Sequence, residues 1–299
     1  MFLLIFYSIN FTHKTEKSMQ RQKIKCKLLA IATSLFVFSG CTQVADLAGY
    51  DSKTLNEDSA KSYAQLINKS RAAGAVDNNS AVAKRVKTIF NRMRPYADAA
   101  NKTGEVFNWQ MNVIRSNDVN AFAMPGGKMV VFTGIVNRLK LNDNEIAAII
   151  GHEMTHALEE HSKKAAGQQI ITNTALKAGG SIIQSKTGLN SSTVDLYKNT
   201  LGKYGLTLPF SRRQENQADI GGLRLMAQAG YNPEAAVTVW QKMNNVMGNN
   251  SSTSLLSTHP SNDSRIASIQ KMLPEVMPLY EQSKYRTSKS SVIKTKRKR

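Results

Sequence analysis

The chain has 299 residues, and its 40 Lys and Arg residues outnumber its 21 Asp and Glu residues by 19. This excess is concentrated at the two ends: residues 1–41 carry a net charge of +5 and residues 284–299 carry +8, which leaves +6 on the body. The two cysteines, Cys26 and Cys41, both precede residue 42, which excludes a disulfide framework for the body. The roughly 240 residues of the body are enough for one sizeable hydrophobic core.

The N-terminal region has the features of an export signal. Residues 19–27 include several basic residues, residues 28–38 form an apolar run, and the small residues Ser39 and Gly40 precede Cys41. The apolar run has about half of the roughly 20 residues that a membrane-spanning helix needs, which favours a removed signal over such a helix. Small residues directly before a cysteine resemble a bacterial lipobox, which implies that Cys41 is lipidated. The alternatives are a plain signal peptide and an apolar segment of the core.

Both ends of the chain bear on its location. Met19 is the expected start of the protein, and residues 1–18 are interpreted as an upstream extension. Thr42 follows the cysteine, which by resemblance to bacterial lipoproteins favours the outer membrane over the inner membrane. We therefore expect a lipid-anchored protein of the bacterial cell envelope that faces the periplasm. Residues 284–299 lack an apolar pattern, which predicts a basic disordered tail that is either solvated or attracted to anionic lipid headgroups. Nucleic acid is not expected as a partner, because export removes it.

The body is predicted to begin with helices. Residues 42–52 are expected to form a short tether. Helical spacing of apolar residues predicts helices at 54–73 and 80–96, and Pro95 is expected to end the second of them. A loop is predicted at 101–104.

Three strands are predicted next. Apolar and polar residues alternate at 107–113, which is typical of a half-buried strand. Two further strands, 119–124 and 129–133, flank a Pro-Gly-Gly turn at 125–127. These strands predict a small antiparallel sheet with one strand near an edge.

A helix from Asn142 to about His161 is the best-defined element. Asn142 can cap it, and Glu145 can complete a capping box three residues later. Apolar residues at helical spacing supply a buried face.

The remaining body is predicted to be helical. Residues 167–207 read as a helical pair with a mobile joint at 187–192. Three more helices are predicted at 211–229, 234–247 and 262–272.

The best-defined helix carries a metal-binding pattern. Residues 152–156 read His-Glu-Met-Thr-His, and positions i and i+4 of a helix face the same way. His152 and His156 can therefore bind one tetrahedral metal ion, while Glu153 can take a proton from the water that attacks a peptide carbonyl. These residue types are the ones that peptide hydrolysis at neutral pH requires.

A catalytic zinc ion needs a third protein ligand. One class of enzyme supplies a histidine six residues after the second, with a glycine between, but Glu159 and Ser162 occupy those places here. His161 lies one residue short of that position and is interpreted as a surface or locally hydrogen-bonded residue. Glu215 on a later helix is the best candidate, and Asp219 lies one turn beyond it, where it can orient a zinc-bound histidine.

Several segments together resemble a known family. Asn120–Gly127, the helix Glu145–His156, Glu215–Asp219, and Ser257-Thr258-His259-Pro260 followed by Arg265 resemble the zinc peptidases related to HtpX and the CAAX prenyl proteases. These peptidases are of the gluzincin type. The export signal and the lack of membrane spans resemble the soluble lipoprotein branch, that of LoiP-type proteases.

The resemblance covers about residues 80–272 and implies roles position by position. It implies one Zn²⁺ ion per chain, with His152, His156 and Glu215 as ligands. It implies Glu153 as the catalytic base. Asp219 matches an acid sometimes assigned as a proton donor, although orienting a histidine fits an ionised carboxylate better.

The same resemblance implies a substrate-binding strand and two further polar residues. Asn120, Ala121, Phe122 and Ala123 match the edge strand that pairs with an extended substrate. His259 matches a position that approaches the metal, where it either keeps the enzyme latent, stabilises the oxyanion, or only caps the turn before Pro260. Arg265 either stabilises the oxyanion or pairs with a nearby acid.

The resemblance implies an α+β, mainly helical, zincin-like fold with a small antiparallel sheet beside the metal-binding helix. Residues 1–41 form the extension and signal, 42–78 a tether and helix, 79–283 the peptidase domain, and 284–299 the tail. The expected function is hydrolysis of envelope proteins in quality control, with protein or peptide substrates. The alternative is a chaperone or assembly factor for outer-membrane proteins with latent protease activity, which would add assembly partners.

Overall fold

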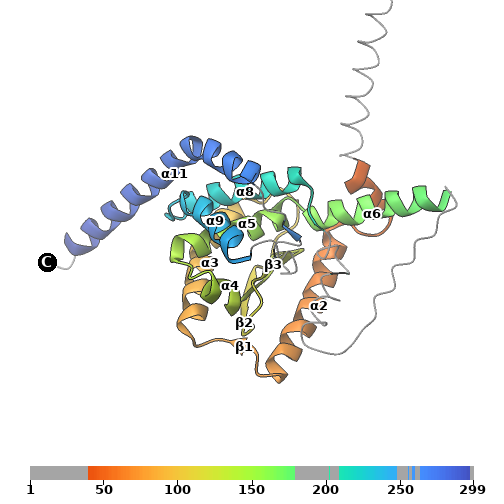
Figure 1. The fold of residues 1–299 in the computed structure, drawn as a ribbon, viewed down its shortest axis with the longest axis horizontal. Helices are drawn as coiled ribbons and strands as arrows, with labels where there is room; N and C mark the ends of the chain where they lie inside the picture. The colour runs from red at the N-terminus through yellow and green to blue at the C-terminus, as the bar shows by residue number, and fades with distance from the viewer. Residues whose placement is uncertain are drawn as a thin grey trace, which may run out of the picture.

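The computed structural model describes residues 40–178, 202, 209–247, 255, 258–259 and 263–296. Residues 19–39 of the predicted signal and the predicted joint at 187–192 lie outside these residues. The described elements are a helix at 40–47, α2 (Ser52–Ala72), β1 (Val76–Asp77), α3 (Ala81–Ala100), β2 (Gln110–Ile114), β3 (Ala121–Met124), β4 (Lys128–Phe132), α4 (Thr133–Arg138), α5 (Asp143–Leu158), α6 (His161–Ala178), α8 (Arg212–Gln228), α9 (Ala235–Met247) and α11 (Asp263–Lys296). The mainly helical α+β class is confirmed (Figure 1).

The sheet is mixed, not antiparallel as predicted. Its order is β1-β2-β4-β3, with β2 and β4 parallel and the two outer pairs antiparallel. The turn at 125–127 makes β3 and β4 a hairpin, and β4 then pairs with β2 in the same direction, so β3 lies at the edge. The sequence does not predict β1, because its two residues are too few for an alternating pattern.

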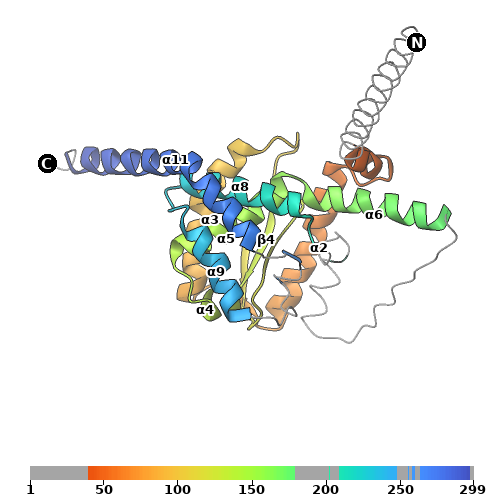
Figure 2. The same ribbon diagram turned by 45° about the horizontal axis from the view of Figure 1, so that its top comes forward.

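The two faces of the sheet belong to different cores. Ala121 and Ala123 of β3 face the larger core, which is formed with α3 and α5. Phe122 and Met124 face a second core formed with α2, where Tyr63 is buried. Figure 2 shows the strands between α2 on one side and α3 and α5 on the other. Because β3 is buried on both faces, its position against α5 is fixed from two directions.

The central helix α5 begins as predicted and ends earlier. The Asn142 side chain accepts a hydrogen bond from the Glu145 N–H, and the Glu145 side chain accepts one from the Asn142 N–H, so the capping box is confirmed. The helix ends at Leu158 rather than near His161. Glu160 has φ of 50°, and this left-handed residue turns the chain into α6.

Two other helices run further than predicted. Pro95 lies inside α3 and does not end it, because Met93 and Ala97 on either side are fully buried and hold the helix in place. The last helix continues from Asp263 to Lys296 through Pro274 and Pro278, so its backbone includes most of the tail predicted to be disordered. Lysine, arginine and serine do not themselves end a helix, which is why polarity alone gave the wrong prediction.

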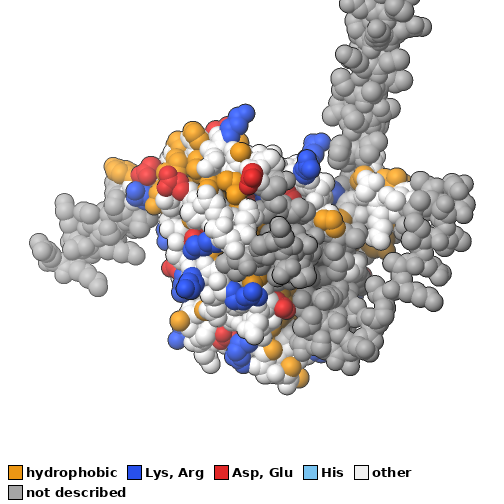
Figure 3. Space-filling view, viewed as in Figure 1, with side chains coloured by type: hydrophobic (Ala, Val, Ile, Leu, Met, Phe, Trp, Pro, Cys, Tyr) orange, Lys and Arg blue, Asp and Glu red, His pale blue; other side chains and the backbone are white. Residues whose placement is uncertain are grey.

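The residues after the proposed lipid site are not an extended tether. The helix at 40–47 packs against α6: Cys41 is buried with its Sγ 3.3 Å from Gln168 Oε1, and Lys163 pairs with Asp46 at 2.7 Å. Within the described residues, no helix has the length and apolar character needed to cross a membrane. Basic and acidic side chains are interspersed over the face seen in Figure 3 and form no single basic patch there.

Candidate metal centre

The centre forms where α5 and α8 cross in close contact. Gly151 of α5 and Gly222 of α8 meet at the crossing, and a Cβ added at Gly222 would lie 2.7 Å from the His152 backbone nitrogen. A Cβ added at Gly151 would lie 2.8 Å from the Gly222 carbonyl oxygen. These two glycines therefore allow the backbones to approach closely enough for Glu215 of α8 to reach the histidines of α5.

Three predicted ligand residues meet at this crossing. His152 Nε2 lies 3.0 Å from His156 Nε2, and Glu215 carboxylate oxygens lie 3.6 Å from His152 Nε2 and 3.4 Å from His156 Nε2. Donors about 2.0–2.1 Å from a tetrahedral zinc ion lie about 3.3 Å from one another. The spacing of the two imidazole nitrogens and the two oxygens of the Glu215 carboxylate therefore fits a single zinc ion.

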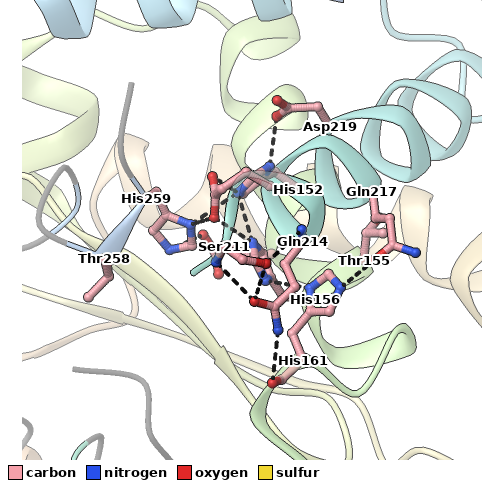
Figure 4. Close-up of polar contacts among 12 residues, drawn as sticks. His152, Thr155, His156, His161, Ser211, Gln214, Gln217, Asp219, Thr258 and His259 are labelled. Carbon is pink, nitrogen blue, oxygen red and sulfur yellow. Dashed lines mark hydrogen bonds and ion pairs between the residues drawn. The ribbon is translucent and has the colours of Figure 1, made fainter. Parts of the chain in front are cut away.

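His152 is oriented by an acid, as the sequence predicts. Its Nδ1 lies 3.0 Å from Asp219 Oδ1 (Figure 4), and an ionised carboxylate can only accept a hydrogen bond. Nδ1 therefore carries the proton, which leaves the lone pair of Nε2 directed toward His156 and Glu215. In this structure a terminal nitrogen of Arg265 lies 3.3 Å from Nε2, and a bound metal ion would take this lone pair instead.

Arg265 pairs with acids, which is one of the two roles considered for it. Its Nε and one terminal nitrogen donate to the two Asp219 carboxylate oxygens at 2.6 and 2.7 Å, and its other terminal nitrogen pairs with Glu215. The guanidinium carbon lies 3.6 Å from the centroid of the Trp240 ring. Arg265 thus fixes both carboxylates of α8, and its stacking on an aromatic ring fixes Arg265.

Glu153 has one occupied and one open carboxylate oxygen. Its Oε2 accepts a hydrogen bond from the Ala123 N–H of β3 at 3.2 Å. Its Oε1 is buried and accepts no hydrogen bond from the described residues, with His259 Nε2 at 3.5 Å. Burial raises the pKa of Glu153, although His259 and His152 act to lower it. An open oxygen in a dry site suits a group that takes up a proton.

His259 joins the three predicted ligands. Its Nδ1 lies 3.0 Å from Glu215 Oε1 and 3.2 Å from His152 Nε2. One donor atom from each of His152, His156, Glu215 and His259 lies within 4.8 Å of the others. Burial acts to lower the pKa of His259, but Glu215 and Glu153 outweigh it and raise that pKa above its ordinary value.

Comparison with known proteins gives the family. The model of peptidase family M48 matches residues 80–273. The chain belongs to peptidase family M48. The earlier resemblance to zinc peptidases is thereby confirmed, and the family implies a bound metal.

Three M48 relatives show the extent of the similarity. The mitochondrial metalloendopeptidase OMA1 of Schizosaccharomyces pombe is 37% identical over 177 residues, 58% of this chain and 50% of its own length. The OMA1 protein of Arabidopsis thaliana is 37% identical over 188 residues, 62% of this chain and 36% of its own length. The metalloprotease LoiP of Escherichia coli is 30% identical over 270 residues, 83% of this chain and 96% of its own length. This M48 chain thus matches half or less of the length of the two OMA1 relatives.

The interpretation of His161 as a surface residue was wrong, whereas local hydrogen bonding is what the structure shows. His161 has no exposed surface, and its Nδ1 lies 2.8 Å from His156 Nδ1. The left-handed conformation of Glu160 is the physical reason, because it breaks the helix and places the His161 side chain differently from a continuous helix. Burial, with a smaller contribution from Lys164, lowers the pKa of His161 to about 3, so this imidazole is neutral.

An apolar pocket opens beside the M48 centre. Its free volume is small, about 20 Å³, and it is bordered by His152 and Glu153. Its apolar lining includes Ile149, Leu223, Met226, Val239, Trp240 and Met243. This pocket was not predicted from the sequence, because the apolar residues of its lining have the pattern of ordinary core residues.

Proposed function

We propose that this chain is a zinc-dependent endopeptidase. His152, His156 and Glu215 hold the metal, and Glu153 acts as the catalytic base. The observation that carries this proposal is the close spacing of the two histidine Nε2 atoms, 3.0 Å apart, and the two Glu215 oxygens, 3.4 and 3.6 Å from them. Beside this group the Glu153 carboxylate keeps one buried oxygen open. When bound, zinc lowers the pKa of a coordinated water and polarises the substrate carbonyl.

The side chains divide the remaining work. Glu153 takes a proton from the attacking water at Oε1 while Oε2 stays bonded to the Ala123 N–H, which keeps the carboxylate in place. Asp219 keeps the proton of His152 on Nδ1, and Arg265 keeps Asp219 ionised and oriented. Burial of the whole set excludes water that would weaken these interactions.

The substrate is proposed to lie along β3. Asn120, Ala121, Phe122 and Ala123 have buried side chains, so a substrate strand would pair with their backbone rather than contact their side chains. Among the described residues β3 pairs only with β4, and its Ala123 N–H points to Glu153.

The cellular setting follows from the export signal and is also proposed. A lipid on Cys41 would anchor the protein at the outer membrane, facing the periplasm, and its substrates would be envelope proteins in quality control. Membrane fractionation of cells that produce the protein checks this location, and recovery only in the soluble fraction would contradict it.

Removal of the metal is expected to abolish peptide hydrolysis. The purified protein should contain one zinc ion per chain, and a chelator should reduce casein cleavage to background because Glu153 then has no polarised water. Adding zinc back should restore cleavage. Cleavage that persists in the zinc-free protein would contradict the proposal.

A second candidate function is supported by the position of His259. Its contacts with Glu215 and His152 place it where it can fill the open position of the metal centre. A centre filled in this way would keep proteolysis latent in a chaperone or assembly factor for outer-membrane proteins.

The variant His259→Ala separates the roles of this residue. If His259 blocks the site about nine-tenths of the time, its removal should raise hydrolysis of a short peptide by about 10-fold. If it stabilises the oxyanion instead, its removal should lower kcat by about 10²-fold or more. We expect the rise. Thermal unfolding of the zinc-loaded variant checks that the fold is intact, and unchanged activity would assign His259 to the turn alone.

A further inference from the structure

The two histidines of α5 have different partners behind them. His152 is backed by the Asp219 carboxylate, whereas His156 is backed by the imidazole of His161, at 2.8 Å between the two Nδ1 atoms. His161 Nε2 in turn lies 3.3 Å from Gln217 Oε1 (Figure 4). Metal-binding histidines usually donate to a carboxylate, a backbone carbonyl or water, so an imidazole in this place is unusual.

The position of the protons in this chain follows from its geometry. His156 directs Nε2 toward His152 and Glu215, so a bound metal would take the lone pair of Nε2 and leave the proton on Nδ1. Among the described residues, the acceptor for that proton is the lone pair of His161 Nδ1, at 2.8 Å. The proton of His161 is then on Nε2, where the Gln217 carbonyl accepts it. His156 Nδ1–H thus donates to His161 Nδ1, and His161 Nε2–H donates to Gln217 Oε1.

Several contacts hold the His161 ring in this place. The left-handed turn at Glu160 directs it back toward α5, and Gln214 Nε2 donates to the His161 carbonyl at 3.4 Å. Phe210 covers both rings, with its centroid 4.1 Å from that of His156 and 6.0 Å from that of His161. The ring is therefore braced from α6, from α8 and from the segment before α8.

We propose that His161, supported by Gln217, is a positioning residue that sets the tautomer and ring orientation of His156 for metal binding. This inference rests on the proposed function, because it takes His156 as a zinc ligand. On α8, Glu215 and Asp219 lie one turn apart on the same face, and Gln217 lies between them in the sequence. The first would bind the metal, and the other two orient the two histidines.

The test measures zinc affinity of the full chain by competition with a chelator of known affinity. His161→Phe keeps a flat ring but removes the acceptor, and zinc should bind about 10–100-fold more weakly. His161→Asn places a carbonyl oxygen near the position of the lost Nδ1, and it should restore the affinity to within a few-fold of the parent. Cobalt-substituted protein should show an altered visible spectrum for the Phe variant and a near-parent spectrum for the Asn variant.

A matched control removes a buried hydrogen bond far from the centre. The Tyr63 hydroxyl donates to the Met129 carbonyl at 2.7 Å in the core between α2 and the sheet. Tyr63→Phe should lower the thermal unfolding midpoint of the zinc-free protein without changing zinc affinity. A general loss of stability would therefore be told apart from a loss of His156 orientation.

Three outcomes decide the inference. Parent-like zinc affinity in a folded His161→Phe protein would overturn it, as would an Asn variant no better than the Phe variant. If the Phe variant does not fold, Gln217→Met is measured instead. This change removes the acceptor for His161 Nε2 and should weaken zinc binding several-fold, so parent-like affinity would again overturn the inference. Absence of zinc binding by the parent chain would instead refute the proposed function.

Discussion

Replacing Glu153 with glutamine is expected to reduce casein cleavage by about 10²–10⁴-fold while zinc content stays at one ion per chain. Glutamine keeps the shape of the side chain and can still accept the Ala123 N–H through its carbonyl oxygen. It cannot take a proton from water, because the atom at the open position is then an amide nitrogen. Cleavage kinetics and metal analysis of the same sample measure both effects.

The same variant should be at least as stable as the parent in the zinc-free form. The pKa of Glu153 is raised by burial, so keeping the carboxylate ionised at neutral pH costs folding free energy. The sign follows: for an acid with a raised pKa in the folded state, stability is lost as pH rises toward that pKa. An uncharged side chain removes this cost, and the thermal midpoint at neutral pH should not fall.

Glu145 provides a matched control on the same helix. It is buried, forms the capping box and pairs with Lys242 at 2.7 Å. Glu145→Gln should lower stability by about 1 kcal/mol and leave the rate of cleavage by the folded protein near that of the parent. If Glu153→Gln retained most of its activity, the base would have to be another residue, and the proposed mechanism would fail.

The sequence was most informative where interactions are local. The capping box and the i, i+4 spacing of His152 and His156 are properties of one helix, so they could be predicted without knowing the fold. Glu215 and Asp219 were found because their spacing resembles a family pattern. The structure brings these two acids to the histidines through the close crossing at Gly151 and Gly222, for which the sequence gives no direct signal.

The features that sequence reasoning missed depend on the path of the chain between elements. His161 was placed by counting along a continuing helix, but α5 ends at Leu158 and one left-handed residue, Glu160, separates it from α6. The parallel pairing of β2 with β4 depends on which edge of β4 the hairpin leaves free. A histidine five residues after His156, next to a predicted helix end, is the signal that could have indicated a local partner.

Replacing Glu215 with glutamine is expected to reduce peptide hydrolysis to background. The variant loses the negatively charged ligand, and a neutral amide oxygen is a much weaker donor to zinc. The substitution also removes one of the two acidic partners of Arg265 described above, so that Asp219 is the one that remains. Glu159→Gln is the control, because Glu159 is a partly exposed acid whose contact with Lys164, at 3.5 Å, is worth little.

Zinc content alone does not test this role of Glu215, because His259 lies close enough to replace it. His259 Nδ1 lies 3.2 Å from His152 Nε2, so the variant can still bind zinc through three histidines. As a zinc ligand, His259 would no longer be able to take part in catalysis. The double variant Glu215→Gln, His259→Ala has only His152 and His156 left of the four clustered donors. We therefore expect weakened zinc binding in Glu215→Gln and no measurable binding in the double variant. Stoichiometric zinc with parent-like activity in the double variant would show that the third ligand lies elsewhere in the chain.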